Sequence, residues 1–275
     1  MKNKIFISVL KLFMIIFILI FIFFPILYSF IFSTFDTVQE QVRDNNTLII
    51  SNWSFQNYTT AIKEGYWKSL IFSFVFAIVL VAFRIIICGM AGYALSRKSL
   101  IFKKTIFFIL LFVSVFPENV LLVGLLGLFN SWDLNSYMGK IFMLSAPSIF
   151  SMFTILLFRN AFMSITDNEQ KIMLLDNLSL IKKISVVYLP KMNIALTLTI
   201  IIGASSAWNS YLWPSIALFN SSEQTLATWV FSIGNLPSGD TSMGTRMAGT
   251  ILYILPITII YTIIHPKVMA SFKKI

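Results

Sequence analysis

Six long apolar runs leave this chain few alternatives to a bundle of membrane-spanning helices. The first runs from Leu10 to Phe32 with almost no polar residue, and about 20 apolar residues are enough for one helix to cross a bilayer. A signal peptide has a shorter apolar core and a small-residue cleavage site, so we expect this run to be the first transmembrane helix, kinked at Pro25. The expected spans cover residues 10–32, 69–95, 105–129, 140–162, 190–218 and 247–270.

The composition favours the same fold class. Hydrophobic residues make up 57% of the 275 residues and charged residues 12%, with a mean hydropathy of +0.85, which is far from the averages of soluble domains. We therefore predict an all-α, polytopic membrane protein with six transmembrane helices, forming a single transmembrane domain over residues 1–275. The polar loops at residues 33–68 and 221–246 are expected to be external.

Positive charge is concentrated on one side of the predicted spans. Of the 21 lysines and arginines, 15 fall in segments that this topology makes cytoplasmic, or at the span ends that border them: Lys2, Lys4, Lys11, Arg97, Lys98, Lys103, Lys104, Arg159, Lys171, Lys182, Lys183, Lys191, Lys267, Lys273 and Lys274. Membrane proteins collect lysine and arginine on the cytoplasmic side, so the pattern predicts that both termini lie inside. The same pattern explains the net charge of +10, because cytoplasmic lysines and arginines lie next to lipid headgroups. No nucleic-acid partner is needed to account for it.

One long polar segment, residues 166–190, interrupts the predicted cytoplasmic side. Thr166 and Glu169 have the spacing of a capping box, which predicts a first helix of about ten residues. Asn177 tolerates the left-handed conformation that ends a helix, and Ser179 is suited to cap a second one. Pro190 predicts that this second helix stops at Leu189. Periodicity alone leaves two interpretations of this segment: an amphipathic loop that rests on lipid headgroups, or a loop that binds a cytosolic partner.

The motifs of catalysis are missing from the sequence. It contains no G-x-x-x-x-G-K-[ST] phosphate loop and no G-x-S-x-G elbow. Its one cysteine, Cys88, and its one histidine, His265, lie in different predicted spans and cannot form a zinc cluster. We expect a non-catalytic protein that needs no metal or cofactor.

Two charged residues, Glu118 and Arg84, fall inside the predicted spans. A charge at the centre of a bilayer costs about 2.5 to 3.5 kcal/mol on insertion scales, so such groups face protein or water. Glu118 follows Pro117, which frees backbone groups that line a cavity in some membrane proteins; the alternative is that Glu118 bonds those freed groups itself. Arg84 is a candidate partner for Glu118 or for another subunit.

The fifth span carries the sequence WNSYLWP at residues 208–214. Aromatic rings stack on the apolar faces of sugars and amides bond their hydroxyl groups, so these residue types suit a carbohydrate path. An aromatic belt at the membrane interface is the alternative. Candidate residues for a translocation path are Glu118, Asn119, Trp208, Asn209, Tyr211 and Trp213.

Several of these segments resemble the permease subunits of ABC importers. Asp176 and Asn177 fall on the Asp-Gly of that family's cytoplasmic loop, and Leu189 and Pro190 on its Leu-Pro. The runs at residues 91–97, AGYALSR, and 208–214 resemble the carbohydrate-uptake class, the group of the second permease subunit of the maltose importer. Residues 247–249, MAG, with Leu255-Pro256, resemble the final span of that subunit.

The resemblance implies a type I ABC importer permease fold with a cytoplasmic coupling helix, in a bacterial cytoplasmic membrane. Its expected partners are a homologous second permease subunit, two cytosolic ATPase subunits, an extracellular solute-binding protein and membrane lipid. The residues expected to couple to the ATPase are Lys171, Ile172, Met173, Leu175, Asp176, Asn177 and Leu178. The implied cargo is a saccharide or a sugar-like solute such as a glycerophosphate.

The sequence departs from the family pattern at two points. Residues 171–173, Lys-Ile-Met, stand where the family has Glu-Ala-Ala, so a carboxylate expected to help docking is replaced by a cation. Asn177 stands where the family has glycine. The alternative function is an ion-gradient-driven secondary carrier that uses Glu118 and Arg84.

Overall fold

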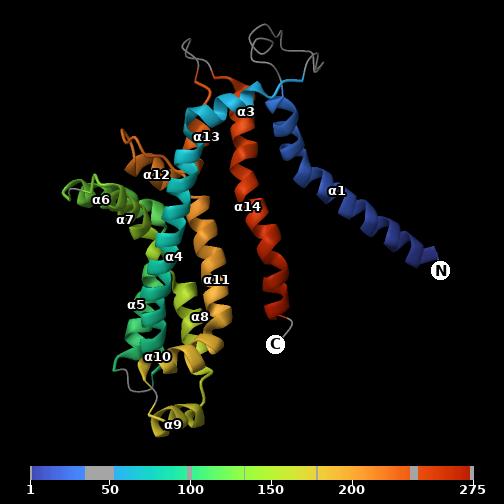
Figure 1. Cartoon of the computed structure of the whole chain (residues 1–275). Helices are drawn as coiled ribbons and strands as arrows, with labels where there is room; N and C mark the ends of the chain where they lie inside the picture. The colour runs from blue at the N-terminus through green and yellow to red at the C-terminus, as the bar shows by residue number, and fades with distance from the viewer. Residues whose placement is uncertain are drawn as a thin grey trace. The chain divides into compact units, whose positions relative to one another are not determined.

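The structure is nearly all helical. The computed structural model describes residues 2–34, 53–97, 101–132, 134–177, 179–235 and 241–272. These residues contain no strand, and an isolated bridge joins Asn235 and Thr241. The elements are α1 (Lys2–Ser33), α3 (Gln56–Ala61), the π-helical turn η1 (Ile62–Tyr66), α4 (Trp67–Ser96), α5 (Lys103–Val115), α6 (Glu118–Asn130), α7 (Tyr137–Ile149), α8 (Met152–Met163), α9 (Asp167–Leu175), α10 (Leu180–Lys182), the π-helical turn η2 (Lys183–Tyr188), α11 (Leu189–Trp208), α12 (Leu212–Ala217), α13 (Leu226–Ser232) and α14 (Met243–Phe272) (Figure 1).

Four helical stretches of the described residues are long and apolar enough to cross a membrane: residues 6–33, 56–96, 183–208 and 243–266. Two further stretches are pairs of helices joined at a sharp bend. The pair over residues 103–129 is bent by 98° and the pair over residues 137–163 by 72°. If each bent pair is one span, the structure has up to six candidate spans, in agreement with the predicted all-α membrane fold.

One compact unit contains residues 1–68 and 228–266. Asn57 is buried in this unit, at 1% exposed. The Asn57 amide donates to the Ser33 carbonyl at 3.0 Å and accepts from the Thr245 hydroxyl at 3.3 Å, so it joins α1, α3 and α14. Nearby, the Glu64 carboxylate accepts from the Gly234 backbone N–H at 3.0 Å.

Two predicted external loops are partly helical. Residues 33–68 were expected to form a loop, but the chain is helical from Gln56 onward and continues through η1 into α4. The expected loop at residues 221–246 contains α13, and α14 begins at Met243. The polar composition misled the prediction, because buried partners such as Asn57 and Thr245 bond one another inside the unit.

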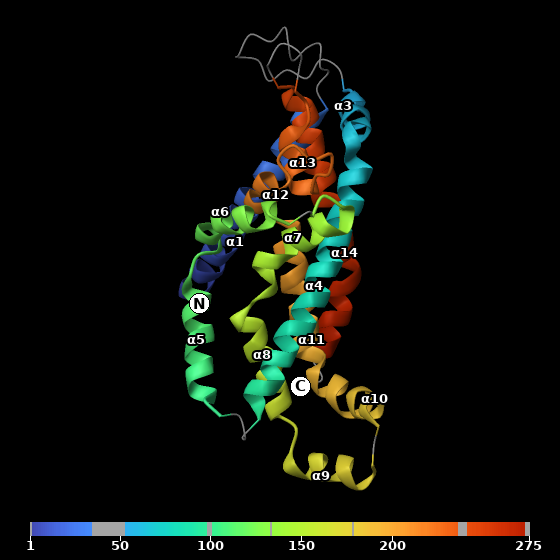
Figure 2. The same cartoon turned by 90° about the vertical axis from the view of Figure 1, so that its left-hand side faces the viewer.

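The other compact unit contains residues 69–227 and 267–275. One hydrophobic cluster joins α4, α6, α7, α11 and α12, with Phe76 of α4, Ile141 of α7 and Trp213 of α12 at its core. A second cluster joins α4, α8 and α11 through Cys88, Ile155 and Ala195, among others. The turned view in Figure 2 shows α4, α8 and α11 running side by side in this unit.

Gly92 lets α4 and α8 approach closely. A Cβ atom built on Gly92 would lie 2.6 Å from the Phe158 Cβ, 2.9 Å from the Arg159 backbone nitrogen and 3.0 Å from the Ile155 carbonyl oxygen. Small residues allow such contacts between membrane helices. Gly92 therefore serves the close packing of α4 against α8.

Substituting Gly92→Ala is expected to lower the thermal stability of the detergent-solubilised protein. The backbone atoms of α8 cannot move aside easily, and overpacking costs about 1 to 3 kcal/mol. Gly89→Ala is the matched control, because it lies in the same helix and its added Cβ would meet no atom within 4 Å. The Tm of Gly89→Ala is expected to stay level or rise, since alanine favours helix. A Gly92→Ala protein as stable as the control would contradict the close α4–α8 contact.

Candidate functional site

Helix α9 is displaced from the rest of its unit. In both Figure 1 and Figure 2 it lies beyond the lower ends of α4, α5, α8 and α11. It is nine residues long, Asp167–Leu175, which corresponds to about 13 Å. A helix in this place is available to a partner on the side of the membrane that the charge distribution predicts to be cytoplasmic.

The start of α9 is fixed by a reciprocal capping box. The Thr166 backbone N–H donates to the Glu169 carboxylate at 2.8 Å, and the Glu169 backbone N–H donates to the Thr166 hydroxyl at 3.3 Å. Two of the donors that a helix leaves free at its N-terminus are thus satisfied. The predicted capping box is confirmed.

The end of α9 is a tight turn. Asp176 donates its backbone N–H to the Ile172 carbonyl at 2.9 Å, and Asn177 follows with a φ of +47°. After Leu178, which lies outside the described residues, the Ser179 hydroxyl accepts from the Lys182 backbone N–H at 3.4 Å. The predicted left-handed asparagine and the predicted serine cap are both confirmed.

The predicted helix stop at Leu189 is wrong. Residues 183–208 form one continuous helical stretch that runs through Pro190 into α11. The turn before the proline is widened to a π-helix, in which the Leu189 backbone N–H donates to the Ile184 carbonyl, five residues back. Because Pro190 sits in the first turn of α11 and the wider turn changes the bonding register, its missing donor does not end the helix.

An ion pair that the sequence did not predict ties α9 to α11. The Lys191 Nζ lies 3.0 Å from the second oxygen of the Glu169 carboxylate. The pKa of Glu169 is lowered, first by the hydrogen bond from the Thr166 backbone and then by Lys191. Glu169 and Lys191 are separated by a turn and a second helix, so no local spacing rule could have paired them.

The two faces of α9 differ in exposure. Met173 is 4% exposed, while Ile172 and Leu175 are 54% and 83% exposed, and Lys171 is exposed beside them. Of the predicted coupling residues, Lys171, Ile172, Leu175, Asp176 and Asn177 are therefore accessible. Met173 faces the protein, where it can anchor α9 but not contact a partner.

The two tryptophans of the predicted translocation path are packed inside their unit. Trp208 is 6% exposed and its ring meets Phe74 edge-on; Trp213 is 5% exposed. The Trp213 indole N–H donates to the Met143 carbonyl at 3.1 Å. Met143 lies four residues before Pro147. Because proline has no backbone N–H, the Met143 carbonyl receives no hydrogen bond from the helix at that position. Trp213 thus completes the hydrogen bonding of α7.

The remaining predicted path residues lie elsewhere. Asn209 and Tyr211 occupy the break between α11 and α12 and are exposed, with Tyr211 at 42%. Glu118 and Asn119 begin α6 just after Pro117, but their side chains lie outside the described part of the structure. Among the described side chains of the predicted translocation path, Asn209 and Tyr211 are therefore the ones exposed enough to contact a solute.

Arg84 is buried at the break between α7 and α8. It is 4% exposed, and its guanidinium donates to the Ser148 carbonyl from Nε at 3.0 Å and also from a terminal nitrogen. The Cys88 thiol, one turn further along α4, donates to the Ile149 carbonyl at 3.4 Å. Together they satisfy carbonyl groups that the end of α7 leaves free.

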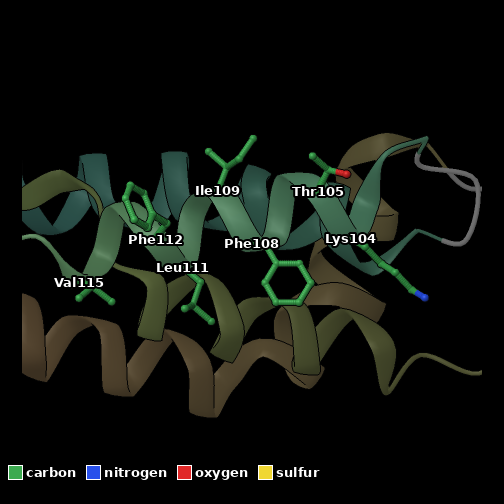
Figure 3. A pocket seen from close by; sticks show the side chains of 7 residues that line it. All are labelled: Lys104, Thr105, Phe108, Ile109, Leu111, Phe112 and Val115. Carbon is green, nitrogen blue, oxygen red and sulfur yellow. The ribbon is translucent and has the colours of Figure 1, made fainter.

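A shallow hollow along α5 holds none of the predicted site residues. Its lining is Lys104, Thr105, Phe108, Ile109, Leu111, Phe112 and Val115 (Figure 3). Apart from Lys104 and Thr105 at one end, the lining is apolar. Such a surface suits lipid or an apolar protein face better than a hydroxyl-rich solute.

Proteins similar to this chain align with most of its sequence. No model of a known protein family matches it. The chain is 26% identical, over 85% of its length and 77% of the relative's, to a probable ABC transporter permease protein of Mycoplasma genitalium. It is 25% identical, over 84% of its length and 82% of the relative's, to the arabinooligosaccharides transport system permease protein AraQ of Halalkalibacterium halodurans.

A solved structure shares the fold. It is a chain of a bacterial ABC transporter involved in the import of the acidic polysaccharide alginate, with a TM-score of 0.78, 20% identity, and coverage of 96% of this chain and 97% of that one. The fold is therefore that of an ABC importer permease. The predicted resemblance to permease subunits of the carbohydrate-uptake class is confirmed by these relatives.

Breaking the capping box is expected to loosen α9. Thr166→Ala removes the N-cap hydroxyl, at a cost of about 1 kcal/mol, which corresponds to about fivefold faster hydrogen exchange of the α9 amides. Ser164→Ala is the control, because its hydroxyl donates only to the Ala161 carbonyl within α8. Equal exchange in the two variants would contradict the cap.

The Glu169 contacts should make the order of α9 depend on pH. Because the folded pKa of Glu169 is lowered, its contribution is complete above the ordinary value of 4.5 and is lost as pH falls through the lowered pKa. Hydrogen exchange of α9, corrected for the intrinsic rate, should therefore accelerate in acid. Glu169→Gln should exchange faster at neutral pH and lose this pH dependence; an unchanged pH profile in the variant would contradict the assignment.

Proposed function

We propose that this chain is a transmembrane permease subunit of an ATP-driven, binding-protein-dependent importer for a saccharide or sugar-like solute. It would form half of the translocation path and leave ATP hydrolysis to separate chains. The observation that carries the proposal is α9, which is held beyond the spans by a capping box and an ion pair and exposes Lys171, Ile172 and Leu175. The fold and the relatives described above support it.

The proposed partners follow from this role. They are a homologous second permease subunit, two cytosolic ATPase subunits that receive α9, an extracellular solute-binding protein, and membrane lipid. In this arrangement both termini are cytoplasmic, as the charge distribution predicts. One of the relatives is named as a permease of an arabinooligosaccharides transport system, which supports a carbohydrate cargo here.

Movement would pass from the ATPase to the spans through α9 and α11. The Glu169–Lys191 pair joins α9 to the first turn of α11, and η2 and α11 form one continuous helical stretch over residues 183–208. Closure of the ATP-bound ATPase pair would displace α9, and this helical stretch would carry that displacement into the unit. A conformational change driven by ATP needs contacts that differ between the open and the closed ATPase pair. The exposed face of α9 can supply such contacts.

Asp176 supports a partner-binding role for the turn. A carboxylate at the C-terminus of a helix is opposed by the helix dipole, by about 0.3 to 1 kcal/mol. Asp176 is exposed at this position, so its charge does not serve the stability of α9. We assign it to the ATPase contact.

Deleting residues 172–178, or replacing Asp176→Ala, is expected to abolish solute uptake and the stimulation of ATPase activity while leaving the protein in the membrane. Leu175→Ser should act in the same direction, because it removes the most exposed apolar contact of α9. Phe219→Ser is the matched control: Phe219 is 78% exposed and Leu175 83%, but Phe219 follows α12 at the other end of the unit. Normal uptake by the deletion variant would rule out coupling through α9.

Purification from native membrane separates the proposal from the secondary carrier. An importer permease is expected to co-purify with an ATPase and a second permease, and to require ATP. A carrier would transport alone, driven by an ion gradient, and would depend on Glu118. Gradient-driven transport by the isolated chain, lost in Glu118→Gln, would overturn the proposal.

A further inference from the structure

The exposed face of α9 combines one cation with two apolar side chains. Lys171 and Leu175 lie one helical turn apart, and Ile172 is next to them on the same side. Met173 is on the opposite, buried side of the helix. A partner that covers this face must therefore accept an apolar ridge and an ammonium group together.

Of the carboxylates near Lys171 in sequence, Asp167 has a side chain outside the described residues, and Glu169 and Asp176 are not placed to neutralise Lys171. Both oxygens of Glu169 are engaged: one accepts from the Thr166 N–H, and the other pairs with Lys191 at 3.0 Å. Asp176 lies five residues after Lys171, which corresponds to about 140° around a helix axis. Among the described side chains of α9, Lys171 is therefore the charge that lies beside Leu175 and Ile172 on the outward face, while Asp176 is exposed in the turn that follows the helix.

The position of α9 favours a protein partner over lipid for this lysine. Lys104 is the second residue of α5, which starts the membrane-crossing pair of helices α5 and α6. In both views α9 lies beyond the lower end of α5 (Figures 1 and 2). Headgroups border the ends of the spans, so they lie nearer to Lys104 than to Lys171. The covering surface for Lys171 is then an aqueous-phase protein.

We propose that the ATPase groove that receives α9 carries a carboxylate that pairs with Lys171, so that this subunit selects an acidic groove. The inference rests on the proposed function, because it describes the surface that the same helix binds. Covering Ile172 and Leu175 removes water from around the pair and strengthens it. A groove with a cation at that point would repel Lys171, which gives the contact specificity as well as affinity.

The test uses the complex of this chain with its ATPase and second permease, reconstituted in proteoliposomes. Lys171→Glu is expected to lower ATPase stimulation about tenfold, while Lys171→Arg keeps most of it, because charge sign decides the contact. Lys104→Glu is the matched control: it reverses an exposed lysine at the membrane end of α5, away from the α9 face. Lys171→Glu within about twofold of the unmodified complex, or an equal loss in Lys104→Glu, would overturn the inference.

Two further arms identify the partner. A Glu→Lys or Asp→Lys substitution in the ATPase groove should restore the Lys171→Glu complex; failure of every acidic position in the groove to do so overturns the inference. The loss should be the same in proteoliposomes of zwitterionic lipid and in those with anionic lipid added. A loss seen only with anionic lipid would mean that Lys171 binds headgroups instead.

These outcomes separate the inference from the proposed function. If Leu175→Ser stops transport and Lys171→Glu does not, coupling through α9 stands and only the acidic groove fails. If neither variant affects transport, the proposed function fails with it.

Discussion

The hydrogen bonding of one broken span constrains the larger compact unit. A carbonyl without a donor inside a bilayer costs several kcal/mol, so every backbone group freed at a break needs a protein partner. Pro147 frees the Met143 carbonyl, which accepts from Trp213, and Arg84 and Cys88 bond the carbonyls at the end of α7. Side chains of α4 and α12 thus hold the 72° bend between α7 and α8. A mid-span arginine and a buried tryptophan acquire structural roles that their residue types alone did not suggest.

The same unit connects α9 to α11 through an ion pair. A helix of nine residues is marginal on its own, because helix nucleation is costly. The capping box and the Glu169–Lys191 pair compensate at its start, and Met173 anchors its inner face. The outer face is left free, with Leu175 exposed. This division of one short helix into an anchored face and a free face is consistent with the coupling role proposed for α9.

Local features of the 166–190 segment could be predicted because each depends on neighbours within three or four residues. The capping box, the left-handed Asn177 and the Ser179 cap are of this kind, and the structure confirms all three. The predicted stop at Leu189 failed for a related reason. A proline rule describes the average α-helix, whereas here a π-helical turn shifts the bonding register and lets the helix continue.

The amino-acid sequence alone established the membrane class, the number of apolar runs and the polar segment between the fourth and fifth, because hydrophobic length and local capping are read along the chain. It did not determine the bends inside the third and fourth spans, the burial of Trp208 and Trp213, or the pairing of Glu169 with Lys191. Those depend on which groups meet across helices. The packing of the helices brings together a freed carbonyl and a donor that lie 64 to 70 residues apart along the chain.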